Sequence, residues 1–127
     1  MHRMLIALSL AVLATFSMAQ TSGSAQTAVL ASINQFVDGF NKGDTKMAVA
    51  ACADETSILD EFPPHEWHGA AACAKWVSDF DADARKNGIT DGVVTLGEAL
   101  HVDINSDYAY VVISGELYVQ AEGEDGQ

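Results

Sequence analysis

The residues best suited to proton chemistry lie in the stretch from residue 57 to 69, which reads SILDEFPPHEWHG. Alternation along this stretch places Asp60 on the same face as Ile58 and Phe62, so its carboxylate would lie between two apolar side chains. Burial among apolar groups disfavours the charged carboxylate and raises its pKa towards the range useful for proton transfer. Asp60 is therefore our candidate general base.

A histidine beside this aspartate would complete an acid–base pair, because imidazole titrates near neutrality. By alternation His65 and Trp67 point to one side, which makes His65 the candidate partner of Asp60. His68 would face outwards, and His101 shares a strand face with Asp103. Taken alone, each histidine more often has a surface or structural role.

This stretch also has two competing interpretations. In the first, Asp60 is structural, hydrogen-bonded to the nearby loop or capping the Pro63-Pro64 turn. The HEWH segment is not the metal-binding H-E-x-x-H helix, because its second histidine comes one residue early and the segment is extended. We therefore predict no metal site and no cofactor.

Three helices and several strands must position these residues. Apolar residues recur at spacings of three and four from Thr27 onward, and Gly43 is suited to end this first helix. Asp44 is the expected N-cap of a short, alanine-rich second helix. A third helix follows Gly69, with an apolar stripe formed by Cys73, Trp76, Val77 and Phe80. Two long strands, residues 92–105 and 107–120, form a predicted hairpin, which gives an α+β fold.

The N-terminal segment has the pattern of a secretory signal peptide. A basic start, an apolar run from Met4 to Phe16 and the small residues Ser17 and Ala19 predict cleavage after Ala19. Residues 20–26 would then be a flexible leader, and residues 27–127 a single domain in the periplasm or outside the cell. The net charge of −12 argues against nucleic acid as a partner, and against anionic membrane surfaces once the signal is removed.

Export would place both cysteines in an oxidising compartment. Cys52 and Cys73 would there form either a structural disulfide or two separate buried thiols, and the sequence leaves both readings open.

The last predicted strand has two unlike faces. Its apolar face, with Ala109, Val111, Ile113, Leu117 and Val119, should cover the helices. Its opposite face carries Tyr108, Tyr110, Glu116 and Tyr118, which suits either a homodimer interface or an exposed sheet face.

The order of these elements resembles the nuclear transport factor 2-like superfamily, which includes SnoaL-like polyketide cyclases, ketosteroid isomerases and scytalone dehydratase. The resemblance is carried by FNKGDTKMAVAACADETSILDEF and then WHGAAACAKWV. It implies a curved antiparallel sheet wrapped as a cone around three helices, with an apolar pocket inside. The expected lining is Phe36, Phe40, Ile58, Phe62, Trp67, Trp76 and Phe80.

The resemblance also places Asp60 where the isomerases have their general-base aspartate. The position of their first-helix tyrosine donor is occupied by Phe36, which argues against steroid isomerisation. The family's last two strands would lie beyond Gln127, and Asp125-Gly126 is a hairpin signal, so we expect a C-terminally truncated member.

Two functions follow as expectations. The first is an exported domain that binds a small apolar molecule, with cofactor-free isomerase or lyase chemistry by Asp60 and His65. The alternative is a non-catalytic ligand-binding or dimerisation module in which Asp60 is structural.

Overall fold

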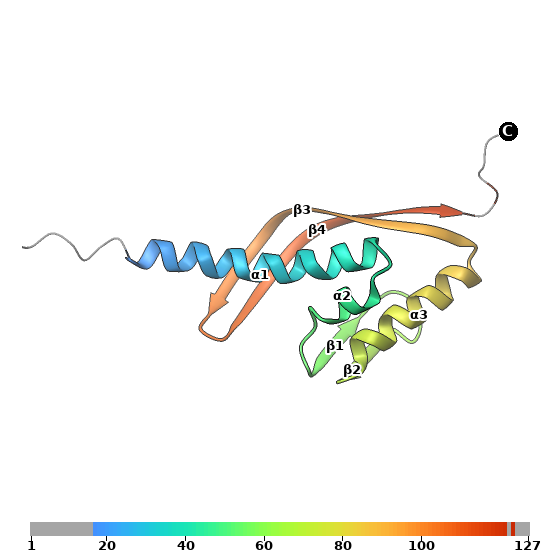
Figure 1. Ribbon diagram of the computed structural model, residues 1–127, viewed down its shortest axis with the longest axis horizontal. Coiled ribbons are helices and arrows are strands. Elements are labelled where there is room, and N and C mark those ends of the chain that lie inside the picture. Colours follow the sequence, from blue (N-terminus) through green and yellow to red (C-terminus); the bar gives the residue numbers. More distant parts are fainter. Residues whose placement is uncertain (1–16, 122, 124–127) are drawn as a thin grey trace, which may run out of the picture.

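The computed structural model describes residues 17–121 and 123, and the surroundings of side chains from Gly23 onward (Figure 1). The apolar run of the predicted signal peptide and the predicted C-terminal hairpin turn lie outside the described residues. Within them the predicted α+β class is confirmed, with three helices and two antiparallel two-stranded sheets that do not join into one.

The first helix, α1, runs from Ser17 to Asn41 and begins ten residues earlier than its apolar stripe predicted. The residues predicted as a flexible leader are therefore helical in the full chain. Extending an existing helix costs little compared with nucleating one, and Gln20, Ala25 and Gln26 in this segment are good helix formers. At the other end Gly43, with φ of +66°, ends the helix in the left-handed conformation as predicted.

The second helix, α2, is a short element from Thr45 to Val49. Asp44 caps it as predicted, because its carboxylate accepts a hydrogen bond from the backbone N–H of Met47 at 2.9 Å. The helix packs against α1 at Gly39, which is buried. A Cβ built on Gly39 would lie 2.9 Å from the Cα of Ala48, so this crossing requires a glycine.

The chain then forms a small hairpin. Strand β1, Thr56–Leu59, pairs with β2, Glu66–Gly69, and Ile58 lies opposite Trp67. The connecting loop contains a cis bond between Pro63 and Pro64 and is closed by a 3.0 Å hydrogen bond from the backbone N–H of Asp60 to the carbonyl of His65. Asp60 thus lies in the loop that follows β1, because the strand ends at Leu59.

Helix α3, Ala72–Lys86, leads into the longest strands of the molecule. Strand β3, Ile89–Asn105, and strand β4, Tyr108–Ala121, form one long ribbon that lies along α1 (Figure 1). Asn41 at the end of α1 fastens this ribbon. Its side-chain amide donates to the carbonyl of Val94 at 2.8 Å, and its amide oxygen accepts from the Val94 N–H at 2.7 Å.

The buried core lies where α2, the small hairpin and α3 meet. Its members are Ala48, Trp67, Ala72, Cys73 and Val77. A disulfide joins Cys52, just after α2, to Cys73 in the first turn of α3, with Cα atoms 6.5 Å apart. Of the two readings that the sequence left open, the structure has the bonded pair. The crosslink closes a 21-residue separation that contains the whole small hairpin.

The Gly39–Ala48 crossing gives a direct test of this packing. We expect Gly39→Ala to destabilise the domain by about 1–3 kcal/mol, because the new methyl group must displace the α2 backbone. Gly23→Ala is the matched control: it lies in the same helix with nothing within 4 Å, and it should be neutral or stabilising by up to about 1 kcal/mol. Urea unfolding measures both, and equal effects would contradict the close crossing.

Candidate functional site

Six aromatic side chains form a continuous cluster between α1, the small hairpin and α3. Every ring lies 5.0 to 6.2 Å, centroid to centroid, from at least one other member. The members are Phe36, Phe40, Phe62, Trp67, Trp76 and Phe80, all of which were predicted to line an apolar pocket. Trp67 is buried and the other five rings are half-buried, so the expected lining forms one aromatic cluster whose rings pack on one another.

Asp60 lies at the margin of this cluster and is half-buried. One carboxylate oxygen accepts a hydrogen bond from the indole N–H of Trp76 at 2.9 Å, and the other accepts from the backbone N–H of Glu61 at 2.6 Å. Both oxygens therefore have fixed donors within the protein. This is the arrangement of a carboxylate that positions a side chain and a loop.

His65 is held by the same loop but not by the carboxylate. It is exposed, has a φ of +75°, and its Nδ1 lies 3.2 Å from the backbone carbonyl oxygen of Asp60. The positive φ breaks the alternation that placed His65 beside Trp67, which is why the predicted orientation is wrong: Trp67 is buried and His65 points to solvent. The structure therefore brings His65 to the main chain of Asp60 and not to its carboxylate.

Two further histidines in the described part of the chain lie on exposed surfaces. His68 faces outward as predicted and pairs with Ser57 across the small hairpin, Nδ1 to Oγ, at 2.9 Å. Its Nε2 lies 3.4 Å from a carboxylate oxygen of Glu66. His101 is on β3 and its ring lies 6.0 Å from that of Tyr110 on β4.

A second carboxylate–indole contact was not anticipated from the sequence. Asp79 on α3 accepts a hydrogen bond from the indole N–H of Trp67 at 2.8 Å and from the Lys75 ammonium at 2.7 Å. These two hydrogen bonds, that of Lys75 first, hold the pKa of Asp79 below its ordinary value. The Lys75–Asp79 spacing of four residues on a helix was a readable signal for the ion pair, but nothing local indicated Trp67 as a partner.

A cavity of about 410 Å³ lies between α1 and the β3–β4 ribbon, with Leu30, Ile33, Leu96 and Ile113 among its lining residues. Another cavity, of about 310 Å³, borders Phe40 and Phe80 and lies between the ends of α1 and α3, the start of α2 and the start of β3. We call it the Phe40–Phe80 cavity. Apolar wall residues include Phe40, Val77, Phe80 and Ala84, and its polar margin includes Asp81, Arg85, Thr90 and Asp91. Asp60 is not among the residues that line it.

A second hollow touches another predicted lining residue. It has a volume of about 290 Å³, opens to the surface between α1 and the end of α2, and is lined by Phe36 together with Ser32, Ile33, Val37 and Ala51. Its shallow, open form offers less enclosure than the Phe40–Phe80 cavity. Of the predicted lining, only Phe40 and Phe80 border that cavity.

No family model matches the chain, and no curated protein matches it. Within residues 17–121 and 123 no cluster of three or more His, Cys, Asp or Glu side chains could hold a metal ion. In that same part of the chain, no helix combines the length and apolar character that a membrane crossing requires.

The role of Asp60 can be measured with a double-mutant cycle. We expect Asp60→Ala and Trp76→Phe each to destabilise the domain by about 1–3 kcal/mol, since each leaves a hydrogen-bonding group of the other unpaired. The double mutant should cost at least about 1 kcal/mol less than the sum of the two singles. Strict additivity in urea unfolding would show that the carboxylate and the indole do not interact.

Asp79 predicts a pH dependence of stability. A lowered pKa in the folded state means that the carboxylate contributes stability above its unfolded value of 3.8, and that this contribution is lost as the pH falls below 3.8 and through the folded pKa. We expect the difference in unfolding free energy between wild type and Asp79→Asn to shrink over this range. Asp81→Asn on the same helix is the control, and a difference that stays constant on acidification would refute the assignment.

Proposed function

We propose that this domain is a non-catalytic binding module for a small, largely apolar molecule, with the ligand held in the cavity between α1, α2, α3 and the start of β3. The observation that carries the proposal is the 310 Å³ cavity with the rings of Phe40 and Phe80 in its wall. Ligand sites in proteins are concave and combine apolar walls with polar groups that orient the ligand. In this cavity apolar and polar surface contribute in about equal parts.

The size of the cavity limits the ligand. Binding sites for drug-sized molecules span about 300–1,000 Å³, so 310 Å³ suits a molecule of one or two rings. Phe40 and Phe80 meet edge to face with centroids 5.0 Å apart and present a rigid aromatic wall. Arg85 and the two aspartates at the margin would contact any polar group that the ligand carries towards the opening.

We do not assign proton transfer to Asp60. A general base must lie within reach of the substrate proton, whereas the Asp60 carboxylate is engaged by Trp76 and Glu61 and lies outside the cavity wall. Catalysis by Asp60 would require release of the Trp76 indole and an opening of the aromatic cluster. A structural Asp60 agrees with the observed hydrogen bonds.

We propose further that the chain is an exported member of the nuclear transport factor 2-like superfamily. It is supported by the order of elements, α1, α2, β1, β2, α3, β3 and β4, which follows the order that the resemblance implies. The curved, cone-shaped sheet belongs to this proposal as well. The Cys52–Cys73 disulfide supports export, because such crosslinks persist in oxidising compartments.

Cavity filling tests the binding site. Wild-type protein should enhance the fluorescence of the neutral apolar probe N-phenyl-1-naphthylamine. Ala84→Trp places an indole in the cavity wall and should weaken probe binding by about tenfold or more, whereas Ala82→Trp, exposed on the same helix, should not.

Both variants are checked by urea unfolding, so that a loss of binding is not mistaken for a loss of folding. Absence of probe binding to folded wild type, or equal effects of the two tryptophans, would contradict the proposed site.

A further inference from the structure

The Phe40–Phe80 cavity is bordered by charged side chains that do not pair with one another. Asp81 and Arg85 come from α3, and Asp91 comes from the start of β3. In the part of the chain that the structure describes, the guanidinium of Arg85 makes no ion pair with either aspartate. The Asp91 carboxylate accepts a hydrogen bond from the backbone N–H of Gly92 at 3.1 Å. These charges are therefore available to a ligand.

Carboxylates outnumber cations among the residues that line the cavity. The two aspartates face one arginine. Lys42 and Lys86 adjoin lining residues along the chain, but neither lines the cavity itself. The whole chain adds a net charge of −12, so the potential at the cavity opening favours a positive group.

Two helix ends also make the cavity attractive to a cation. Helix α1 has 25 residues and α3 has 15, and residues near the C-terminus of each line the cavity. A helix C-terminus carries a partial negative charge of roughly half an elementary charge. The last turn of α1 contains no basic residue, whereas Arg85 lies in the last turn of α3 and offsets the dipole of that helix. Arg85 therefore has a role that requires no anionic ligand.

The aromatic wall suits the same kind of ligand. The rings of Phe40 and Phe80 are half-buried, so part of each remains open to the cavity. The face of an aromatic ring attracts a cation within about 6 Å of its centroid. The same rings provide apolar area and edge or face contacts for an aromatic ring of the ligand.

We propose that the ligand of the Phe40–Phe80 cavity is a small organic amine, with one aromatic ring and a protonated nitrogen. This inference rests on the binding function proposed above and names the ligand class for the same cavity. The ring of the ligand packs against Phe40 and Phe80, and its ammonium group lies at the margin that carries Asp81 and Asp91. A carboxylate ligand would meet two like charges there and one opposite charge.

Three one-ring compounds of different charge test the ligand class: phenethylamine is a cation, phenethyl alcohol is neutral and phenylacetate is an anion. Each is titrated into isotope-labelled protein at about 0.15 M salt, and amide chemical shifts report both the affinity and the place of binding. We expect the amine to bind at least about tenfold more tightly than the alcohol, and phenylacetate to bind most weakly. The shifts should gather on the lining residues of α3 and of the start of β3.

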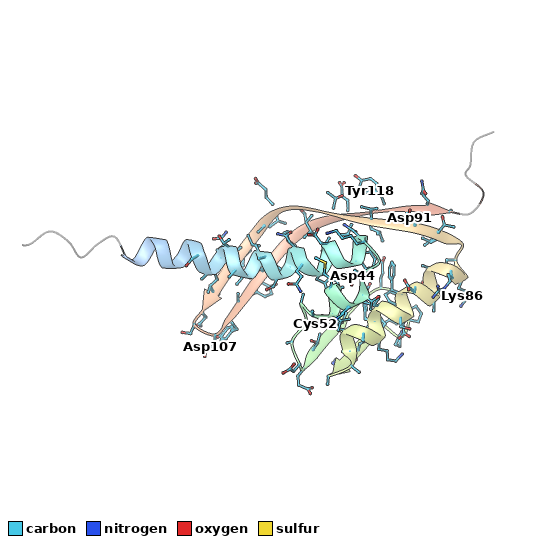
Figure 2. The ribbon with its side chains drawn as sticks, viewed as in Figure 1. Asp44, Cys52, Lys86, Asp91, Asp107 and Tyr118 are labelled. Carbon is cyan, nitrogen blue, oxygen red and sulfur yellow. A yellow bond between two sulfur atoms is a disulfide. The ribbon has the colours of Figure 1, made fainter. Side chains whose placement is uncertain are left out.

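Three variants identify the groups that select the amine. Asp91→Asn keeps an oxygen for the Gly92 N–H but removes one charge, so the ratio of the alcohol Kd to the amine Kd should fall about two- to fivefold. Arg85→Gln should raise that ratio, because it removes a cation from the margin. Asp107→Asn is the charge-matched control at the far end of the ribbon and should leave the ratio unchanged (Figure 2). Taking the ratio within each variant cancels a general change in the cavity.

The possible failures separate the ligand class from the binding site. Shifts in the cavity with equal affinity for the amine and the alcohol would refute the ligand class and leave the proposed site standing. No shift in the cavity with any of the three compounds would contradict both. A ratio that falls equally in Asp107→Asn would show general attraction to an acidic chain and overturn the inference. So would tighter binding of phenylacetate that is lost in Arg85→Gln.

Discussion

Two reciprocal hydrogen bonds between indole groups and carboxylates hold the small hairpin against α3. Trp67 on β2 donates to Asp79 on α3, and Trp76 on α3 donates to Asp60 at the end of the hairpin's first strand. Each element thus supplies one indole and one carboxylate. A buried indole N–H needs an acceptor, and these two find theirs only when the hairpin and the helix are correctly docked. The disulfide from Cys52 to Cys73 fixes the same junction covalently.

This docking determines what the carboxylates are free to do. A carboxylate that accepts two fixed donors is pre-organised as an acceptor and has little freedom to receive a substrate proton. Asp60 and Asp79 each accept two such hydrogen bonds, so neither carboxylate is suited to proton transfer. The candidate binding site is instead the cavity bordered by Phe40 and Phe80. Phe40 and Phe80 in the cavity wall belong to the aromatic cluster between α1, the small hairpin and α3. The contacts that dock the hairpin on α3 therefore also hold the cavity wall in place.

The long ribbon depends less on this core than the helices do. It is attached along α1 and through Asn41, while ten large apolar residues in the described part of the chain are exposed, nine of them on β3 and β4. Exposed apolar area of this extent is typical of interaction surfaces. Asn41 occupies part of the β3 edge, whereas β4 pairs with β3 alone among the described residues.

Much of the secondary structure was determined by the sequence itself. Helical spacing, the cap at Asp44, the stop at Gly43 and the turn between the long strands are local signals, and each appears where local chemistry requires it. The positive φ of His65 and the partners of Asp60 were decided by tertiary structure, because alternation cannot report a loop that reverses it. Likewise, the same apolar spacing describes a ring that lines a pocket and a ring that fills a core. Only the packing of α1, the hairpin and α3 separates the two, since a cavity is the space left when distant segments meet.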